Sequence, residues 1–124
     1  MRQAALAALA ICAVVACAGA PVEPDAPVSV SGLELSPYGV HEECRTLEPG
    51  DRLDYRFSAS APVAFNIHYH DGNAIVIPMS HDDVTSDSGI FHPALSEDFC
   101  LTWQAGLTAV TLEYRVAVRR KRPS

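Results

Sequence analysis

The sequence predicts an all-β protein: a single antiparallel β-sandwich of jelly-roll or Greek-key type with one disulfide. Apolar and polar residues alternate with period two along most of the chain, which is the pattern of half-buried strands. Short groups of turn-forming residues separate these runs. Outside the apolar N-terminus no stretch has a helical period, so we expect seven or eight short strands.

Residues 1–16 are expected to form a secretory signal peptide. Arg2 supplies the only positive charge before an apolar run that extends from Ala4 to Ala16 and is too short to span a bilayer as a helix. The run ends in "VVAC", which resembles the bacterial lipobox. This resemblance implies that Cys17 becomes the first residue of the mature chain and carries diacylglycerol and a further acyl chain such as palmitate. An ordinary secretory signal, cut after "ACA" or "AGA", is the alternative.

Residues 17–27 are expected to link the lipid to the folded domain. The segment includes "PVEPDAP", in which three prolines among seven residues favour an extended tether. Ala18, rather than Asp, follows Cys17, and by resemblance to the enterobacterial sorting rule this implies the outer membrane, with the domain facing the periplasm. Stable anchoring requires two or more acyl chains, which lipoprotein processing supplies.

The β-sandwich is expected to occupy residues 28–118. The clearest alternation lies at 53–57 and 110–118. "EPGD", "DGN", "SDSG" and "AGLT" are expected to form turns. Trp103, with Phe99 and Leu101 at period two, is expected to anchor the core. Further strands are predicted at 28–35, 42–47, 63–70, 74–79, 89–95 and 98–104.

The folded part of the chain is acidic except at its end. Removal of Arg2 with the signal leaves eight basic against fifteen acidic residues, so no nucleic-acid partner is suggested. Residues 119–124 form a basic tail that begins with "RRKR". We expect this tail to be solvated and to keep the last strand soluble, with contact to anionic lipid headgroups or to an acidic partner as the alternative.

The four cysteines have separate expected fates. Cys12 leaves with the signal and Cys17 carries the lipid. Cys44 and Cys100 then remain in an oxidising compartment, where a disulfide is the expected state. It would bring an early strand beside the penultimate one and cover the Trp103 layer. A metal site built from cysteines would need more thiols or a CxxC spacing, and the sequence has neither.

The surroundings of these two cysteines resemble the GOLD domain, the β-sandwich of the p24 cargo-receptor family. "EECRTLEPGDRLDYRF" around Cys44 and "EDFCLTWQ" around Cys100 carry the resemblance, which spans residues 33–118. It implies a binding or adaptor sandwich that contacts proteins or lipids without catalysis. The sequence shows neither the coiled coil nor the sorting tail of p24 proteins, so cargo transport is not implied.

Two histidines in "FNIHYH" raise the question of a metal site. His68 and His70 share one face of a strand, about 7 Å apart. Zinc or copper would suit such a pair, but the facing strand is expected to place Val76 and Ala74 opposite them, and neither is a ligand. We favour the interpretation that both histidines are ordinary polar residues of an outward or sheet-covering face, one of them bonded to a neighbouring carboxylate. Candidates for a third ligand are His81, His92, Asp71, Asp82 and Asp83.

The sequence carries no motif of a known catalytic class. It has no GxSxG elbow and no phosphate-binding glycine loop, and the acids of "SHDDVTSDSG" do not have EF-hand spacing. We therefore predict a non-catalytic binding module, without a required cofactor, attached to the membrane by its lipid. Its expected partner is an unidentified envelope protein or lipid. The alternative function is periplasmic zinc or copper binding through His68 and His70.

Overall fold

The computed structural model describes residues 25–123, in which all the regular structure is β-strand. The predicted signal peptide, Cys17 and the predicted tether up to residue 24 lie outside the described residues. No helix among those described is long and apolar enough to cross a membrane. Every strand pair is antiparallel, which confirms the predicted fold class. The strands are β1 (Val28–Leu35), β2 (Val40–Leu47), β3 (Arg52–Asp71), β4 (Ala74–Phe91), β5 (Glu97–Ala105) and β6 (Val110–Arg119).

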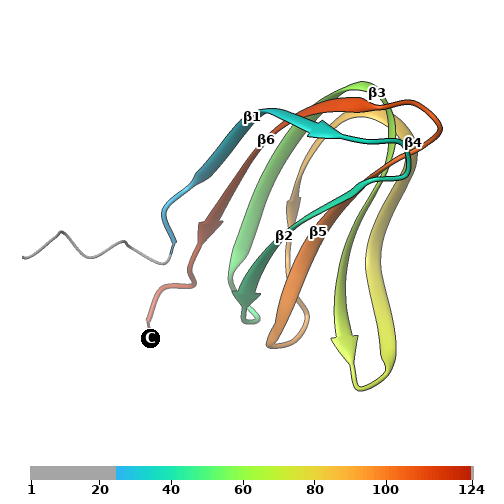
Figure 1. Cartoon of the computed structure of the whole chain (residues 1–124). Helices are drawn as coiled ribbons and strands as arrows, with labels where there is room; N and C mark the ends of the chain where they lie inside the picture. The colour runs from blue at the N-terminus through green and yellow to red at the C-terminus, as the bar shows by residue number, and fades with distance from the viewer. Residues whose placement is uncertain (1–24, 124) are drawn as a thin grey trace, which may run out of the picture.

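All six strands belong to one hydrogen-bonded sheet, shown in Figure 1, with the order β1-β6-β3-β5-β2 and β4 paired to β3. β6 and β5 lie end to end along β3, because β6 pairs with residues 52–59 and β5 pairs with residues 63–68. β1 and β2 continue the sheet outward from β6 and β5. The sheet is therefore four strands wide. β4 and β3 each run its full length, whereas β5 and β6 lie end to end in the third position and β2 and β1 in the fourth.

β3 bends near its middle. Ser58 pairs with Ser86, whereas Val63 pairs with Val84, so four residues of β3 lie opposite one residue of β4. Extra residues of this kind form a bulge, which bends a strand and increases its twist. The bend lies where β6 gives way to β5 as the partner of β3, and it divides the sheet into two halves.

The turns 36–39 and 106–109 lie together beside this bend, on the right of Figure 1. The Tyr38 N–H donates to the Gly106 carbonyl, and the Ala105 N–H donates to the Gly39 carbonyl, both at 2.9 Å. A Cβ on Gly39 would lie 2.8 Å from the Ser36 carbonyl oxygen, so a larger residue does not fit without a shift. Direct backbone bonds therefore fix the corner of the folded sheet.

The core lies between the two halves, which we call the first and second layers. Trp103 and Phe65 of the second layer meet Tyr114 and Phe57 of the first, with ring centroids 4.5 Å apart for Trp103 and Tyr114 and 4.8 Å for Phe57 and Phe65. Trp103 is fully buried, which confirms it as the core anchor. The first layer contains β1, β6, residues 52–59 and residues 86–91; the second contains β2, β5, residues 63–71 and residues 74–84.

A disulfide joins Cys44 of β2 to Cys100 of β5, as predicted. The two residues lie directly opposite each other in the strand pair, with their Cα atoms 4.0 Å apart. The expectation that the bond covers the Trp103 layer is wrong. Trp103 lies three residues beyond Cys100, and side chains that far apart on a strand point to opposite faces. The disulfide is on the outer face and fastens the edge strand β2 to β5.

The strand count and one turn differ from the sequence prediction. The predicted strands 53–57 and 63–70 form the single strand β3, and β4 contains 74–79 together with the first three residues of 89–95, so the described residues form six strands. "SDSG", predicted as a turn, lies inside β4, whereas "EPGD", "DGN" and "AGLT" do separate strands. The small residues and proline of "SASAP" bend β3 without ending it: residues 60–62 have no partner in the strand register, and pairing resumes on both edges at Val63.

The C-terminal tail is tied to the domain by ion pairs. Arg120 donates to Asp25 at 2.6 Å and to Asp51 at 3.0 Å, and Lys121 lies 3.2 Å from Glu48. Burial alone would raise the pKa of Asp51, but the N–H donors of Lys121 and Glu48 together with the Arg120 guanidinium lower it. Arg120 and Lys121 remain exposed to solvent, and these ion pairs hold their side chains against the domain.

Removing the disulfide should destabilise the domain strongly. Replacing Cys44 and Cys100 by alanine removes a link between residues 56 apart in sequence, which corresponds to about 4 kcal/mol of unfolding free energy. Urea unfolding of the double variant and of the oxidised wild type measures this difference. A reducing agent should destabilise the wild type similarly and leave the variant unchanged. Equal stability of the oxidised wild type and the variant would contradict this role.

Candidate functional site

Four arginines project from the outer face of the first layer. Arg52 and Arg56 come from β3, and Arg115 and Arg119 come from β6. In the antiparallel pair Arg56 lies directly opposite Arg115, and Arg52 lies opposite Arg119. We call Arg56 and Arg115 the arginine pair.

Two similar pentapeptides produce the arginine pair. "LDYRF" in β3 and "LEYRV" in β6 each alternate apolar and polar residues, so that leucine and tyrosine point into the core and arginine points outward. The two segments pair antiparallel about Arg56 and Arg115. The inner face of this strand pair is therefore apolar, and its outer face is charged.

The four arginines differ in their counter-charges. Arg52 lies 3.0 Å from Asp54, and Arg119 lies 3.7 Å from the same carboxylate. Within residues 25–123, neither member of the arginine pair has a carboxylate oxygen within 4.0 Å. Like charges directly opposite each other destabilise a strand pair. The first layer therefore keeps two adjacent positive charges that its own structure does not neutralise.

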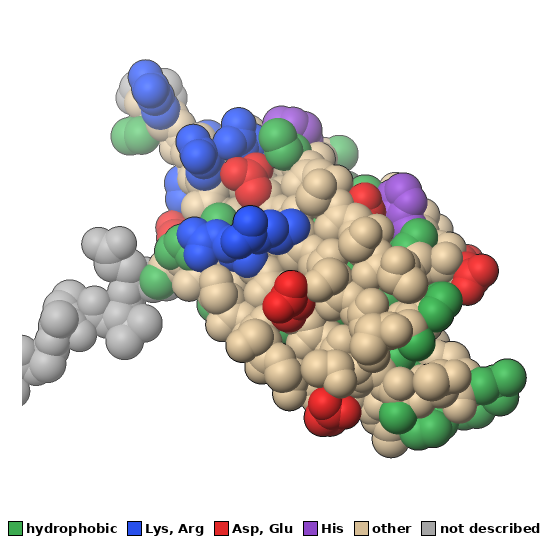
Figure 2. Space-filling model, turned by 90° about the horizontal axis from the view of Figure 1, so that it is seen from above, with side chains coloured by type: hydrophobic (Ala, Val, Ile, Leu, Met, Phe, Trp, Pro, Cys, Tyr) green, Lys and Arg blue, Asp and Glu red, His purple; other side chains and the backbone are tan. Residues whose placement is uncertain are grey.

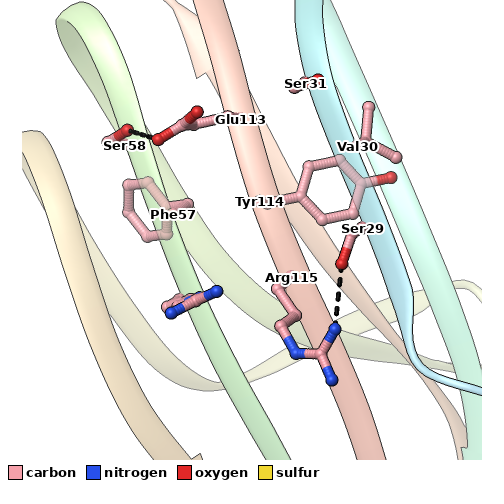
Figure 3. Close-up of a pocket in the computed structure, with 9 residues that line it drawn as sticks. Ser29, Val30, Ser31, Phe57, Ser58, Glu113, Tyr114 and Arg115 are labelled. Atoms are coloured by element: carbon pink, nitrogen blue, oxygen red, sulfur yellow. Dashed lines mark hydrogen bonds between the residues drawn. The ribbon is translucent and has the colours of Figure 1, made fainter.

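The arginine pair lines a surface depression of about 470 Å³. Figure 3 shows that Arg115 donates to the Ser29 hydroxyl at 3.1 Å, while the Ser58 hydroxyl donates to Glu113 at 2.8 Å. The one acidic side chain in the lining is thus engaged by a serine. The lining residues are Ser29, Val30, Ser31, Arg56, Phe57, Ser58, Glu113, Tyr114 and Arg115.

Charge is distributed unevenly between the layers. The strands of the second layer carry one basic residue, Arg45, whereas the four arginines above belong to the first layer. Figure 2, seen from above the view of Figure 1, shows Lys and Arg side chains gathered on the left and hydrophobic side chains at the lower right. The first-layer strands balance their four arginines with four acidic residues, Glu34, Asp54, Asp87 and Glu113, so this layer is close to neutral whereas the second layer is acidic. The acidic residues in the second-layer strands are Glu42, Glu43, Asp71, Asp82, Asp83, Glu97 and Asp98.

Two tyrosines on the inner side of the same strands engage further carboxylates. The Tyr55 hydroxyl donates to Asp87 at 3.2 Å, and the Tyr114 hydroxyl donates to Glu43 at 3.1 Å. Burial, reinforced by these carboxylates, raises the pKa of both hydroxyls to about 12. The two hydroxyls therefore stay neutral donors at physiological pH. Asp87 and Glu43 are bound by tyrosines rather than by the arginine pair.

His68 and His70 project from the same face of β3, as predicted, with their ring centroids 5.3 Å apart. His70 is exposed, but His68 is only 6% exposed, so His68 is a buried polar residue rather than one open to solvent. His68 Nδ1 lies 2.9 Å from Asn66 Oδ1 and 3.3 Å from Thr102 Oγ1. The β5 side of the sheet covers this ring, because His68 pairs with Cys100.

The register opposite the histidines also differs from the prediction. Ile75, rather than Ala74, lies opposite His70, and Val76 lies opposite Tyr69 rather than His68. Asp71 pairs with Ala74, so a two-residue turn of Gly72 and Asn73, rather than all three residues of "DGN", sets this register. The conclusion that the facing residues offer no metal ligand is unchanged.

The other candidate ligands do not join this pair. His81 lies 3.7 Å from Asp87, and His92 is exposed just after β4. Among the described residues, the one group of three possible ligands with mutually close atoms is Glu42, Cys44 and Cys100. Its two cysteines form the disulfide and have no thiolate to offer. The nearest acidic group to the histidine pair is Glu42, 3.7 Å from His68 Nε2.

Sequence reasoning missed the arginine pair. The signal was present in "LDYRF" and "LEYRV", because both arginines occupy polar positions of strands with period two. Their juxtaposition depends on the register between β3 and β6, which period two alone does not give.

Comparison with known proteins gives a likeness of fold. No protein-family model matches the chain, and no curated protein is significantly similar to it in sequence. Among solved structures, the chain is similar to Aeromonas hydrophila PliG, a periplasmic lysozyme inhibitor of g-type lysozyme, with a TM-score of 0.58 and 12% identity. The similarity covers 77% of this chain and 88% of that protein. At this identity the likeness concerns the fold.

The two histidines should respond differently to replacement by alanine. His68→Ala leaves buried polar partners unsatisfied and should cost about 1–3 kcal/mol of unfolding free energy, whereas His70→Ala should change it by less than about 0.5 kcal/mol. Urea unfolding measures both.

Zinc or copper(II) titration of the wild type should give affinities no tighter than about micromolar, because two ligands hold a metal weakly. A nanomolar stoichiometric site, lost in the double variant, would contradict this expectation.

Proposed function

We propose that this protein is a non-catalytic binding protein of the bacterial envelope, held at the outer membrane by lipid on Cys17, and that its partner is another protein. The observation that carries the proposal is the likeness of its fold to PliG over 88% of that inhibitor's length. A likeness of fold does not by itself transfer a partner. The surface of this chain supplies independent support.

The arginine pair has properties of a protein-recognition site. Arginine is over-represented in protein interfaces and among the residues that dominate their binding energy. The arginine pair stands on two neighbouring strands of a folded sheet, so binding does not require the chain to order a loop first. Charge segregation of this kind also accelerates encounter with a partner of opposite charge.

The tether limits how far the domain can lie from its proposed anchor. Asp25 is fixed to Arg120 at 2.6 Å, and Cys17 lies eight residues earlier in the sequence. Eight residues of extended chain span at most about 28 Å. The proposed lipid would thus keep the domain close to the membrane surface, within reach of envelope proteins.

A g-type lysozyme is the first partner to test. The purified mature chain should bind such an enzyme with an affinity of about micromolar or tighter and should reduce its lysis of cell-wall material. Calorimetry measures binding, and the turbidity of a bacterial cell-wall suspension measures lysis. A lysozyme of another type serves as the control for non-specific charge attraction. Absence of binding at about 100 µM would reject this partner.

Replacing Cys17 tests the proposed anchor. Cys17→Ala removes the thiol to which diacylglycerol would attach, so the protein should lose palmitate labelling and move from the membrane fraction to a soluble fraction. Fractionation of cells that express each form measures this change. Cys12→Ala, within the predicted signal, is the matched control and should leave the distribution unchanged. A Cys17→Ala protein that remains in the membrane fraction with unchanged processing would exclude lipidation at this residue.

A further inference from the structure

We propose that the arginine pair is the docking site for acidic side chains of a protein partner, whose carboxylates project into the depression between β1, β6 and β3. The inference rests on the proposed function, protein binding, and names the chemistry of the surface that is recognised. A guanidinium group presents a planar fork of N–H donors that matches a carboxylate in bidentate geometry.

The geometry favours a small group of carboxylates as the occupant. Residues directly opposite in an antiparallel pair have Cβ atoms about 5 Å apart, so Arg56 and Arg115 start from neighbouring points on the sheet. The hydroxyls of Ser29, Ser31 and Ser58 line the same depression and can add donors. Carboxylates bound here would also relieve the repulsion between the two arginines.

Carboxylates of this chain near the site are already engaged. Glu113 accepts a hydrogen bond from Ser58, and Asp54 is shared by two other arginines. Asp87 accepts from Tyr55 on the inner side of the sheet. Within residues 25–123 no carboxylate is therefore left for the arginine pair, and a carboxylate of another molecule can take that place.

A membrane surface fits the arginine pair less well than a protein does. Anionic lipid is recognised by clusters of several free basic residues. The basic tail would be such a cluster, but Arg120 and Lys121 are held by carboxylates of the domain itself. Arg56 and Arg115 instead lie within a lined depression, which projecting side chains can enter.

A second copy of this chain is also a poorer fit. The acidic second layer of one molecule complements the arginine pair of another. Such a front-to-back contact uses two different surfaces and generates open chains of molecules unless its rotation happens to close. An acidic surface on a different protein satisfies the same charges without that consequence.

The test uses the full mature chain and a hexaglutamate peptide as the acidic probe. The peptide should shift the Nε–Hε NMR signals of Arg56 and Arg115, and its affinity should fall as salt is added. Arg56→Ala with Arg115→Ala should weaken binding by at least about tenfold. Arg119→Ala with Arg122→Ala removes the same charge from the same part of the molecule and should weaken it far less.

A folding control accompanies these variants. Thermal unfolding should show that each double variant is folded. If the variant with Arg56→Ala and Arg115→Ala does not fold, Arg56→Gln with Arg115→Gln replaces it, because glutamine keeps a long polar side chain without the charge. Equal peptide affinity in the wild type and the arginine-pair variant would overturn the proposal.

Three further measurements separate the competing occupants. Binding of phosphatidylglycerol vesicles without binding of the peptide would overturn the proposal in favour of lipid. Concentration-dependent assembly of the wild type, abolished by the arginine-pair variant, would overturn it in favour of self-association. Binding of the wild type and the variant to a g-type lysozyme with equal affinity would leave the proposed function standing and reject this docking site.

The docking site can also hold when the proposed lysozyme partner does not. A wild type that binds hexaglutamate through the arginine pair, but does not bind the lysozyme, would reject that enzyme as partner and support the docking site. Loss of both lysozyme and peptide binding in the arginine-pair variant alone would support both proposals.

Discussion

The fold depends on the continuity of β3 through both layers. Residues 52–59 pair with β6 and residues 63–68 pair with β5, so one strand supplies the centre of each half of the sheet. The bulge between Ser58 and Val63 lets the strand bend without losing its partners. The aromatic core forms because this bend turns Phe57 toward Phe65 and brings Tyr114 over Trp103. Without it the same six strands would expose that apolar face.

The same constraint positions the charged surface. Alternation along β3 and β6 sends every second side chain into the core, and the remaining positions necessarily face outward. Because Tyr55 and Tyr114 are committed to the interior, the arginines that follow them in sequence must share the outer face. Burial of the aromatic residues and exposure of the arginine pair are thus two results of one strand pairing.

Local patterns in the sequence predicted much of this fold. Period two identified Val28–Leu35 and nearly all of Val110–Arg119, and elimination among four cysteines gave the disulfide. The merging of neighbouring strands into β3 and β4 was not predictable, because a bend and a chain reversal use similar small residues and proline. The arginine pair and the burial of His68 both depend on which strands are neighbours, and alternation within one strand does not contain that information.

The outer-face disulfide changes which parts of the domain can open independently. β2 is an edge strand with one hydrogen-bonded neighbour, and edge elements with few contacts are usually among the first to detach in local unfolding. Because Cys44 and Cys100 are covalently joined, β2 cannot leave the sheet unless β5 moves with it. β5 carries Trp103 and lies between two partners in the core. Amide protons of β2 should therefore exchange with solvent in a common opening event with those of β5. For the same reason β2 should resist cleavage by a protease.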